Sequence, residues 1–174
     1  MPLSRIPSGR LRCIALPALV VYVIAVLPFV LVDELDDMVG LQLAWSESEA
    51  REIVADWSDG EVVDMAFLQG ADALHALALG LLLGVAAVWA GRRIGLRASH
   101  WAPIVAWMAV AAAVIDTLEN VGMIVMIRGN VDDPVPAITT VLAVAKFSIL
   151  LAVLLYVLGG ITARLRRSSS SPRP

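Results

Sequence analysis

The sequence is poor in charged residues, and this separates it from an ordinary water-soluble domain. Only 17% of its 174 residues are charged, while 59% are hydrophobic. A soluble globular domain has about a quarter of its residues charged. The mean hydropathy of the chain is +0.82, which also argues against an intrinsically disordered chain. The composition therefore favours an integral membrane protein.

Cysteine and lysine are nearly absent, and this restricts the chemistry. Cys13 is the sole cysteine, which excludes an internal disulfide and a cysteine-based metal site. The chain also lacks a glycine-rich phosphate loop and a histidine pair of the haem-binding kind. Of the 13 basic residues, 12 are arginine, and the single lysine, Lys146, lies within a long apolar run. Nothing in this composition points to a nucleic-acid partner.

Four long apolar segments predict an all-α fold, an integral membrane four-helix bundle. A helix that spans a membrane needs about 20 mostly apolar residues. The segments that meet this length are 13–32, 65–90, 101–127 and 135–162. The first is longer than the apolar core of a signal peptide and is followed by no small-residue cleavage pattern, so we expect a retained anchor helix. We predict one transmembrane domain over residues 1–164, with an outer loop at 33–64 and a disordered cytoplasmic tail at 165–174.

The distribution of arginine predicts the orientation of this bundle. Ten arginines lie before the first segment, between the second and third, or after the fourth. The opposite connections contain only Arg51 and Arg128, together with 13 of the 16 acidic residues. By the positive-inside rule, both termini face the cytoplasm and the acidic connections face outward. The basic ends also suit anionic lipid headgroups, so we expect membrane lipid as a partner.

The predicted outer loop contains the signal of one short helix. Ser46 and Glu49 have the spacing of a helix capping box. Apolar residues then follow at helical spacing, namely Ala50, Ile53, Val54 and Trp57. We predict a short amphipathic helix over 46–58, ended by Asp59-Gly60. We expect it to lie on the outer membrane surface, with its tryptophans at the interface.

Polar side chains fall inside three of the four apolar segments, and in each segment they share one helix face. The principal ones are Asp72 and His75 in the second segment, Asp116, Glu119 and Asn120 in the third, and Lys146 in the fourth. At about 1.5 Å per residue, these positions lie roughly 12–20 Å below the outer ends of their helices. We therefore predict one shared, buried polar cluster.

The charges of this cluster do not balance, and this suggests a function. A charged side chain at the centre of a spanning helix costs about 2.5–3.5 kcal/mol, so the charges must pair inside the bundle. Lys146 and a protonated His75 can neutralise two of the three carboxylates. The third needs a proton or a bound cation. The leading hypothesis is a proton- or cation-coupled carrier of a small solute, in which Asp116 or Glu119 holds the proton.

Other functions remain open from the same residues. The protein could be an accessory membrane subunit, or an intramembrane enzyme that uses these carboxylates as general acid and base on a lipid or isoprenoid. The cluster could also be purely structural, because polar groups and small residues such as Gly80 and Gly84 hold membrane helices together. We expect a non-enzymatic role and no cofactor. We expect no metal, because the membrane segments hold a single histidine and Lys146 would compete for the carboxylates. Since four helices are few for a carrier, we expect a homodimer or a larger membrane complex.

Two short motifs resemble those of a known group of proteins. The third segment reads Asp-Thr-Leu-Glu-Asn from Asp116, and the fourth contains Ala-Lys-Phe around Lys146. Over roughly residues 40–160 this resembles a group of small bacterial four-helix membrane proteins that carries no established activity. The resemblance implies that Asp72, Asp116, Glu119, Asn120 and Lys146 are the characteristic positions. It also implies a bacterial cytoplasmic (inner) membrane.

Overall fold

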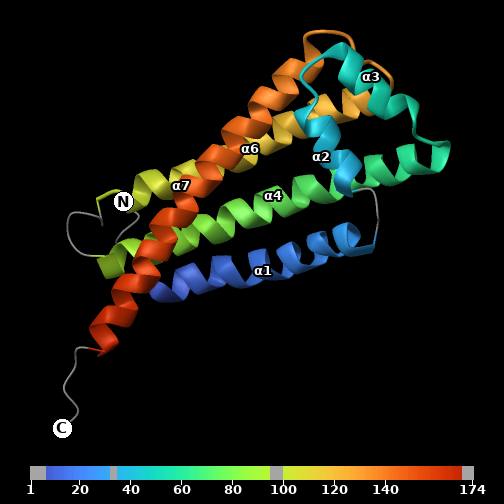
Figure 1. Cartoon of the computed structure of the whole chain (residues 1–174). Coiled ribbons are helices and arrows are strands. Elements are labelled where there is room, and N and C mark those ends of the chain that lie inside the picture. The colour runs from blue at the N-terminus through green and yellow to red at the C-terminus, as the bar shows by residue number, and fades with distance from the viewer. Residues whose placement is uncertain (1–6, 32–34, 95–99, 170–174) are drawn as a thin grey trace.

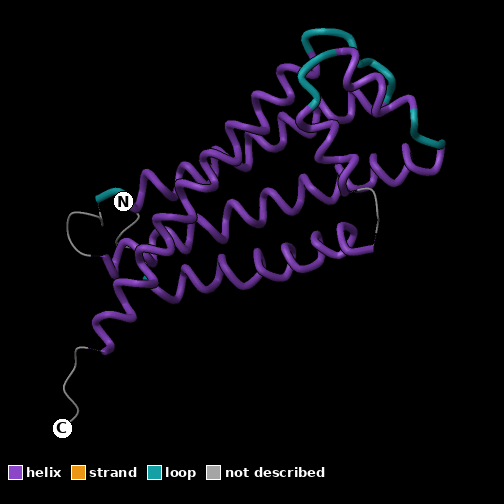
Figure 2. Tube along the Cα trace, in the orientation of Figure 1, coloured by secondary structure: helices purple, strands orange, loops and turns teal. Residues whose placement is uncertain are grey.

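The computed structural model describes residues 7–31, 35–94 and 100–169, and in these ranges the protein is all-α (Figures 1 and 2). The four long helices are α1 (Ser8–Leu31), α4 (Asp59–Ile94), α6 (Ala102–Ile127) and α7 (Val135–Ser169). Two short helices, α2 (Leu35–Leu43) and α3 (Glu47–Ala55), lie between α1 and α4 in the chain. Each long helix is long and apolar enough to cross a membrane. The protein is therefore a multi-pass membrane protein, and the predicted fold class is confirmed.

Three of the long helices form the centre of the bundle. The helices α4, α6 and α7 each pack against the other two, whereas α1 packs mainly along α4 at the edge (Figure 1). The outward faces of all four carry exposed leucine, isoleucine and valine side chains. In water this surface would be unfavourable by about 25 cal/mol per Å². Hydrocarbon removes that cost. The membrane environment therefore explains both the apolar outer surface and the burial of the polar residues described below.

Close packing of α4 on α6 depends on Gly80. A Cβ atom placed on Gly80 would lie 2.9 Å from the Cβ of Ala113 and 3.0 Å from the carbonyl oxygen of Ala109. Gly84, one turn further along α4, is less restricted, because its Cβ would lie 3.5 Å from the nearest backbone oxygen. Small residues allow such backbone contact, which is a main source of helix association in membranes.

Two further glycines, which the sequence analysis did not single out, fix the position of α7. A Cβ on Gly122 of α6 would collide with the side chain of Thr139 on α7. A Cβ on Gly160 of α7 would lie 2.6 Å from the Cα of Ala90 on α4 and even closer to its Cβ. Each pair of central helices therefore meets at a glycine. These contacts could not be found in the sequence, because each one joins residues that are far apart along the chain.

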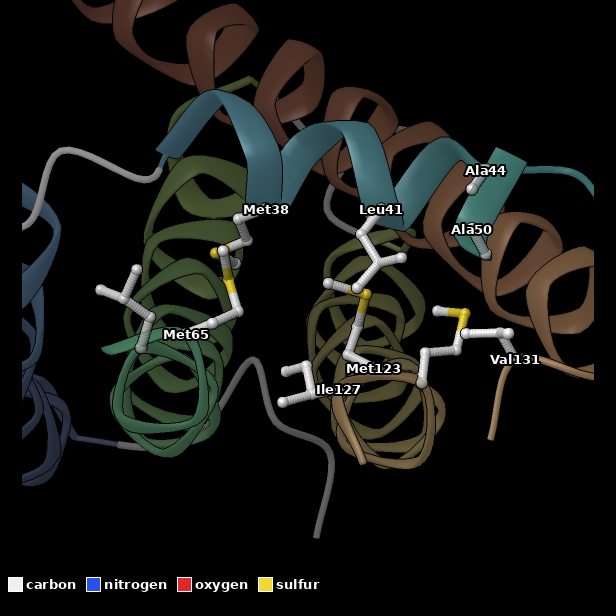
Figure 3. Packing of buried hydrophobic residues seen from close by; sticks show 10 residues of the cluster. Met38, Leu41, Ala44, Ala50, Met65, Met123, Ile127 and Val131 are labelled. Carbon is white, nitrogen blue, oxygen red and sulfur yellow. The ribbon is translucent and has the colours of Figure 1, made fainter. Parts of the chain in front are cut away.

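The short helices α2 and α3 close one end of the bundle. Ten buried residues form what we call the end cluster (Figure 3). They are Met38, Leu41, Ala44, Ala50, Met65, Leu68, Met123, Met126, Ile127 and Val131. The apolar face of α3 contributes Ala50 to it, and Ile53, Val54 and Trp57 pack against it. The predicted amphipathic helix is present, and its apolar face packs on the end of the bundle.

Polar contacts at the same end fasten α3 to the turn between α6 and α7. The guanidinium of Arg51 lies 2.6 Å from a carboxylate oxygen of Glu47 and 3.3 Å from one of Asp132. The hydrogen bond to Glu47 is the main cause that raises the pKa of Arg51 above its ordinary value. Both contacts are exposed to solvent, so they orient α3 more than they stabilise it.

The boundaries of the short helices differ from those predicted. The predicted cap of α3 is present, since the backbone N–H of Glu49 donates to Ser46 Oγ at 3.3 Å. However, the predicted stop at Asp59-Gly60 is wrong, because α3 ends at Ala55 and Asp59 is the first residue of α4. Ser58 and Glu61 form a second capping box, in which the Ser58 N–H donates to the Glu61 carboxylate at 2.6 Å. This cap starts the second spanning helix six residues before the predicted position.

The predicted outer loop and the predicted tail also differ from the structure. The loop contains α2 as well as α3, and α2 was missed because it has little more than two turns of apolar pattern. The tail was predicted to be disordered from residue 165, yet α7 continues through Ser169. No glycine or proline occurs between 161 and 169 to end it. Residues 170–174 lie outside the described part, as do Arg5 and Arg97 of the orientation argument.

The contact at Gly160 yields a test of the packing. Gly160→Ala should destabilise the protein by about 1–3 kcal/mol, because the new methyl group meets the backbone of Ala90 and one helix must shift. Gly70→Ala is the matched control, since a Cβ there meets nothing within 4 Å. Thermal unfolding in detergent measures both. Equal stability of the two variants would contradict the close approach of α7 to α4.

Candidate functional site

The centre of the site is a buried lysine held by two carboxylates. Lys146 Nζ on α7 lies 2.6 Å from Asp116 Oδ1 and 2.8 Å from Glu119 Oε2, both on α6. The spacing of three residues places the two carboxylates on the same face of α6. Lys146 is 3% exposed and Glu119 is fully buried. The expected contact of Lys146 with Asp116 and Glu119 is therefore present.

A second pair of ionisable groups lies on α4. His75 Nδ1 is 3.4 Å from Asp72 Oδ1, and the two residues are three apart on one face of the helix. The His75 ring is half-buried against α1, where the rings of Tyr22 and Phe29 lie 5.0 and 5.9 Å from it between centroids. The first spanning helix thus contributes aromatic packing to the site, and it holds the histidine in place.

Two buried amide side chains accompany these groups, and several polar atoms of the amides and of the carboxylates have no hydrogen-bond partner among the described residues. Asn120 Nδ2 donates to Asp116 Oδ2 at 3.5 Å, which is a long hydrogen bond. Gln69 is fully buried, and neither of its side-chain polar atoms has a hydrogen-bond partner within the described residues. The same holds for Asp72 Oδ2 and Asn120 Oδ1. Buried polar atoms are normally paired, so these four atoms are exceptions among the described residues.

A cavity of about 240 Å³ connects the two ion-paired groups. Asp72 and His75 reach it from α4, Asp116 from α6 and Lys146 from α7. Most of the remaining wall is apolar, and it includes residues of α2. Glu119 does not line it. The cavity therefore reaches Lys146 and Asp116, whereas Glu119 contacts Lys146 away from the cavity wall.

The exposed residues of the wall show where the cavity opens. Val39 of α2 is 44% exposed and Phe147 of α7 is 52% exposed, and both line the cavity. We infer that its mouth lies between α2 and α7. Gln42 of α2 also lines the cavity and is 3% exposed. Gln42 was not predicted as a site residue, because it lies outside the long apolar runs that mark the spanning helices.

The structure brings the predicted site residues together in two groups. Asp116, Glu119, Asn120 and Lys146 form one group between α6 and α7, and Asp72 and His75 form the other on α4. Gly80 and Gly84 contact α6 one or more turns away. Within the ranges that the structure describes, no three His, Cys, Asp or Glu side chains converge as metal ligands.

The geometry predicts how the cluster responds to loss of its cation. Lys146→Met should destabilise the protein by about 3–5 kcal/mol, because it leaves two buried carboxylates without their partner. Glu119→Gln should cost less, since Lys146 keeps Asp116. Arg128→Met, which removes an exposed cation at the end of α6, is the control. Unfolding in detergent measures all three.

A triple variant shows whether the loss of stability comes from unpaired charges or from the changed shape of the side chains. Combining Lys146→Met with Asp116→Asn and Glu119→Gln removes every charge of the group, so it should recover much of the lost stability. If Lys146→Met alone is as stable as Arg128→Met, the buried ion pairs do not stabilise the bundle.

Comparison with known proteins gives no identification. No protein family, no curated protein and no solved structure matches this chain. The resemblance to small bacterial four-helix membrane proteins therefore identifies no family. What is established is a multi-pass helical membrane protein, in which α4, α6 and α7 enclose buried charged residues that include the ion pairs of Lys146 with Asp116 and Glu119.

Proposed function

We propose that this protein is a membrane carrier that couples the movement of a small solute to binding of a proton. The observation that carries the proposal is the cavity of about 240 Å³ that reaches Asp72, His75, Asp116 and Lys146. A purely structural network would be closed and fully paired, whereas this one has an open side. The cavity has room for roughly eight water molecules at about 30 Å³ each, which suits a small solute.

The charge of the cluster supports a bound proton. Asp72, Asp116 and Glu119 face one lysine and one histidine. Even with His75 protonated, one negative charge is left over in a site with little water. An unpaired buried charge costs far more than protonation of a carboxylate, so the group retains a proton or takes up a cation. Because Asp116 and Asp72 line the cavity and Glu119 does not, the first two are the carboxylates that can exchange this proton with the cavity.

The short helix α2 is the element that would control access. It covers the cavity through Met38 and Gln42, and its end is fastened to α7 by a hydrogen bond of 2.9 Å from Thr140 Oγ1 to the carbonyl oxygen of Ala44. A nine-residue helix held by few polar contacts can move at less cost than a spanning helix. In this proposal, protonation at Asp116 and the position of α2 are coupled through the solute that touches both.

The distribution of arginine supports a membrane location and an orientation for the carrier. We place it in a bacterial cytoplasmic membrane, with both termini on the cytoplasmic side, because the arginines gather at the end of the bundle away from α2 and α3. The cavity beside the buried charges is small, at about 240 Å³. A homodimer or a larger membrane complex would supply the rest of a pathway.

A second candidate function is supported by the position of the mouth. The opening between Val39 and Phe147 faces the side of the bundle, where lipid would lie. A lipid or isoprenoid could enter there, and Asp72 with His75 could act on it as general base and acid. This enzyme would need the same carboxylates. It is distinguished from the carrier by its product, since it changes a lipid and leaves the pH inside a vesicle unaltered.

Labelling with dicyclohexylcarbodiimide tests for the proton itself. This apolar reagent modifies protonated carboxyl groups within membranes, and we expect it to modify Asp116 or Asp72 through the lateral mouth. Labelling should fall as the pH rises, because the deprotonated carboxylate does not react. Peptide mass spectrometry locates the site, and Asp64, an exposed carboxylate of α4, is the control. Absence of labelling at every pH would contradict a proton-bearing carboxyl that faces the cavity.

Flux in proteoliposomes tests the transport. Vesicles loaded with a pH-sensitive dye are challenged in turn with small amines, carboxylic acids and amino acids. We expect at least one class to change the internal pH, and Asp116→Asn to abolish the change while Asp64→Asn preserves it. No pH change with any class, or a change that survives Asp116→Asn, would overturn the carrier. Conversion of added lipid that Asp72→Asn abolishes would instead support the enzyme.

A further inference from the structure

A larger cavity lies at the other end of the bundle, far from the buried cluster. It has a volume of about 640 Å³ and is lined by residues of the start of α1 and of the last turns of α4. Its inner wall is apolar and includes Leu11 and Val85. Its rim carries Arg12 from α1 and Arg92 and Arg93 from α4. The cavity thus combines an apolar channel with a cluster of three positive charges.

The chain provides no negative side chain to balance these arginines. Residues 1–32, 73–115 and 134–174 contain no aspartate and no glutamate. The carboxylate nearest along α4 is Asp72, twenty residues before Arg92, which corresponds to about 30 Å along a helix. The sequence therefore places no carboxylate side chain near this basic rim, which suits it to an anion from outside the chain. At this end of a spanning helix, the abundant anions are lipid phosphates.

The side chains of the rim suit a phosphate group. Arginine has a planar fork of donors that binds phosphate oxygens in pairs. The guanidinium of Arg93 lies 5.3 Å from the ring centroid of Trp89, which also lines the cavity. Arg92 Nη1 donates to Ser8 Oγ at 3.4 Å, so the rim joins α4 to the beginning of α1. Tryptophan and arginine together are typical of the level at which lipid headgroups lie.

We propose that this cavity binds one anionic phospholipid, with its phosphate among Arg12, Arg92 and Arg93 and an acyl chain along the apolar wall. The volume falls within the range of about 300–1,000 Å³ that is common for ligand sites. Because α1 packs mainly on α4, a lipid between them fills the interface that holds the first helix. The site does not depend on the function proposed for the buried cluster.

Lipid retention measured by native mass spectrometry tests this site. The purified protein is titrated in detergent with phosphatidylglycerol or with phosphatidylcholine of the same acyl chains. We expect one phosphatidylglycerol to bind, with a preference of about tenfold or more over phosphatidylcholine. The double variant R12Q/R93Q should lose this preference. The variant R10Q/R128Q removes the same charge from two exposed arginines outside the cavity, and it should keep it.

A second variant keeps all charges and changes only the space. Ala15 lines the cavity, and Ala15→Phe should obstruct the apolar channel and lower phosphatidylglycerol binding even if R12Q/R93Q fails to fold. Equal binding of the two lipids by the unaltered protein would overturn the proposal. So would unchanged retention in Ala15→Phe, or an equal loss in R10Q/R128Q. Displacement of the lipid by glycerol 3-phosphate alone would show a site for free phosphate compounds, which also overturns the lipid assignment.

Discussion

The ion pairs of Lys146 are the constraint on which the remaining structure depends. A lysine near the middle of a spanning helix is tolerated only where its charge is paired. Both of its carboxylate partners lie on α6, at 2.6 and 2.8 Å. These contacts fix how far α6 and α7 are rotated about their axes and how far one is shifted along the other. Gly122 permits the close approach, because any side chain there would collide with Thr139. Ionic pairing thus specifies the register, and glycine makes this register sterically possible.

Asp72 is the third carboxylate, and it leaves the buried charges unbalanced. Two carboxylates and one lysine could form a fixed structural group, but Asp72 adds a negative charge that His75 can only partly offset at 3.4 Å. The cavity lies where these two groups face each other. Open space is expensive in a packed interior, and so are buried polar atoms without partners. In the proposed carrier, the bound proton and solute would occupy this space and pair with these atoms.

The sequence alone predicts the features that are local, and it fails at those that depend on tertiary contacts. Segment length and hydropathy identify the four spans, and helical spacing with depth identifies the contact of Lys146 with Asp116 and Glu119. The glycine contacts at 122 and 160 depend on which helices are neighbours, which no local pattern reveals. The start of α4 at Asp59 was missed for a different reason. The capping box at Ser58 was present, but Asp59-Gly60 was interpreted as a helix stop.

The distribution of charge along the bundle explains why the cavity lies near the α2 and α3 end. Thirteen of the 16 acidic residues belong to the connections at that end, and the other three are the carboxylates of the buried cluster. A negatively charged surface raises the local concentration of protons and cations beside it. In the proposed carrier, this surface would supply protons to a cavity just below it whose wall carries an excess carboxylate. At the opposite end the arginines would repel the same ions, so the proposed mechanism requires the site to lie where it does.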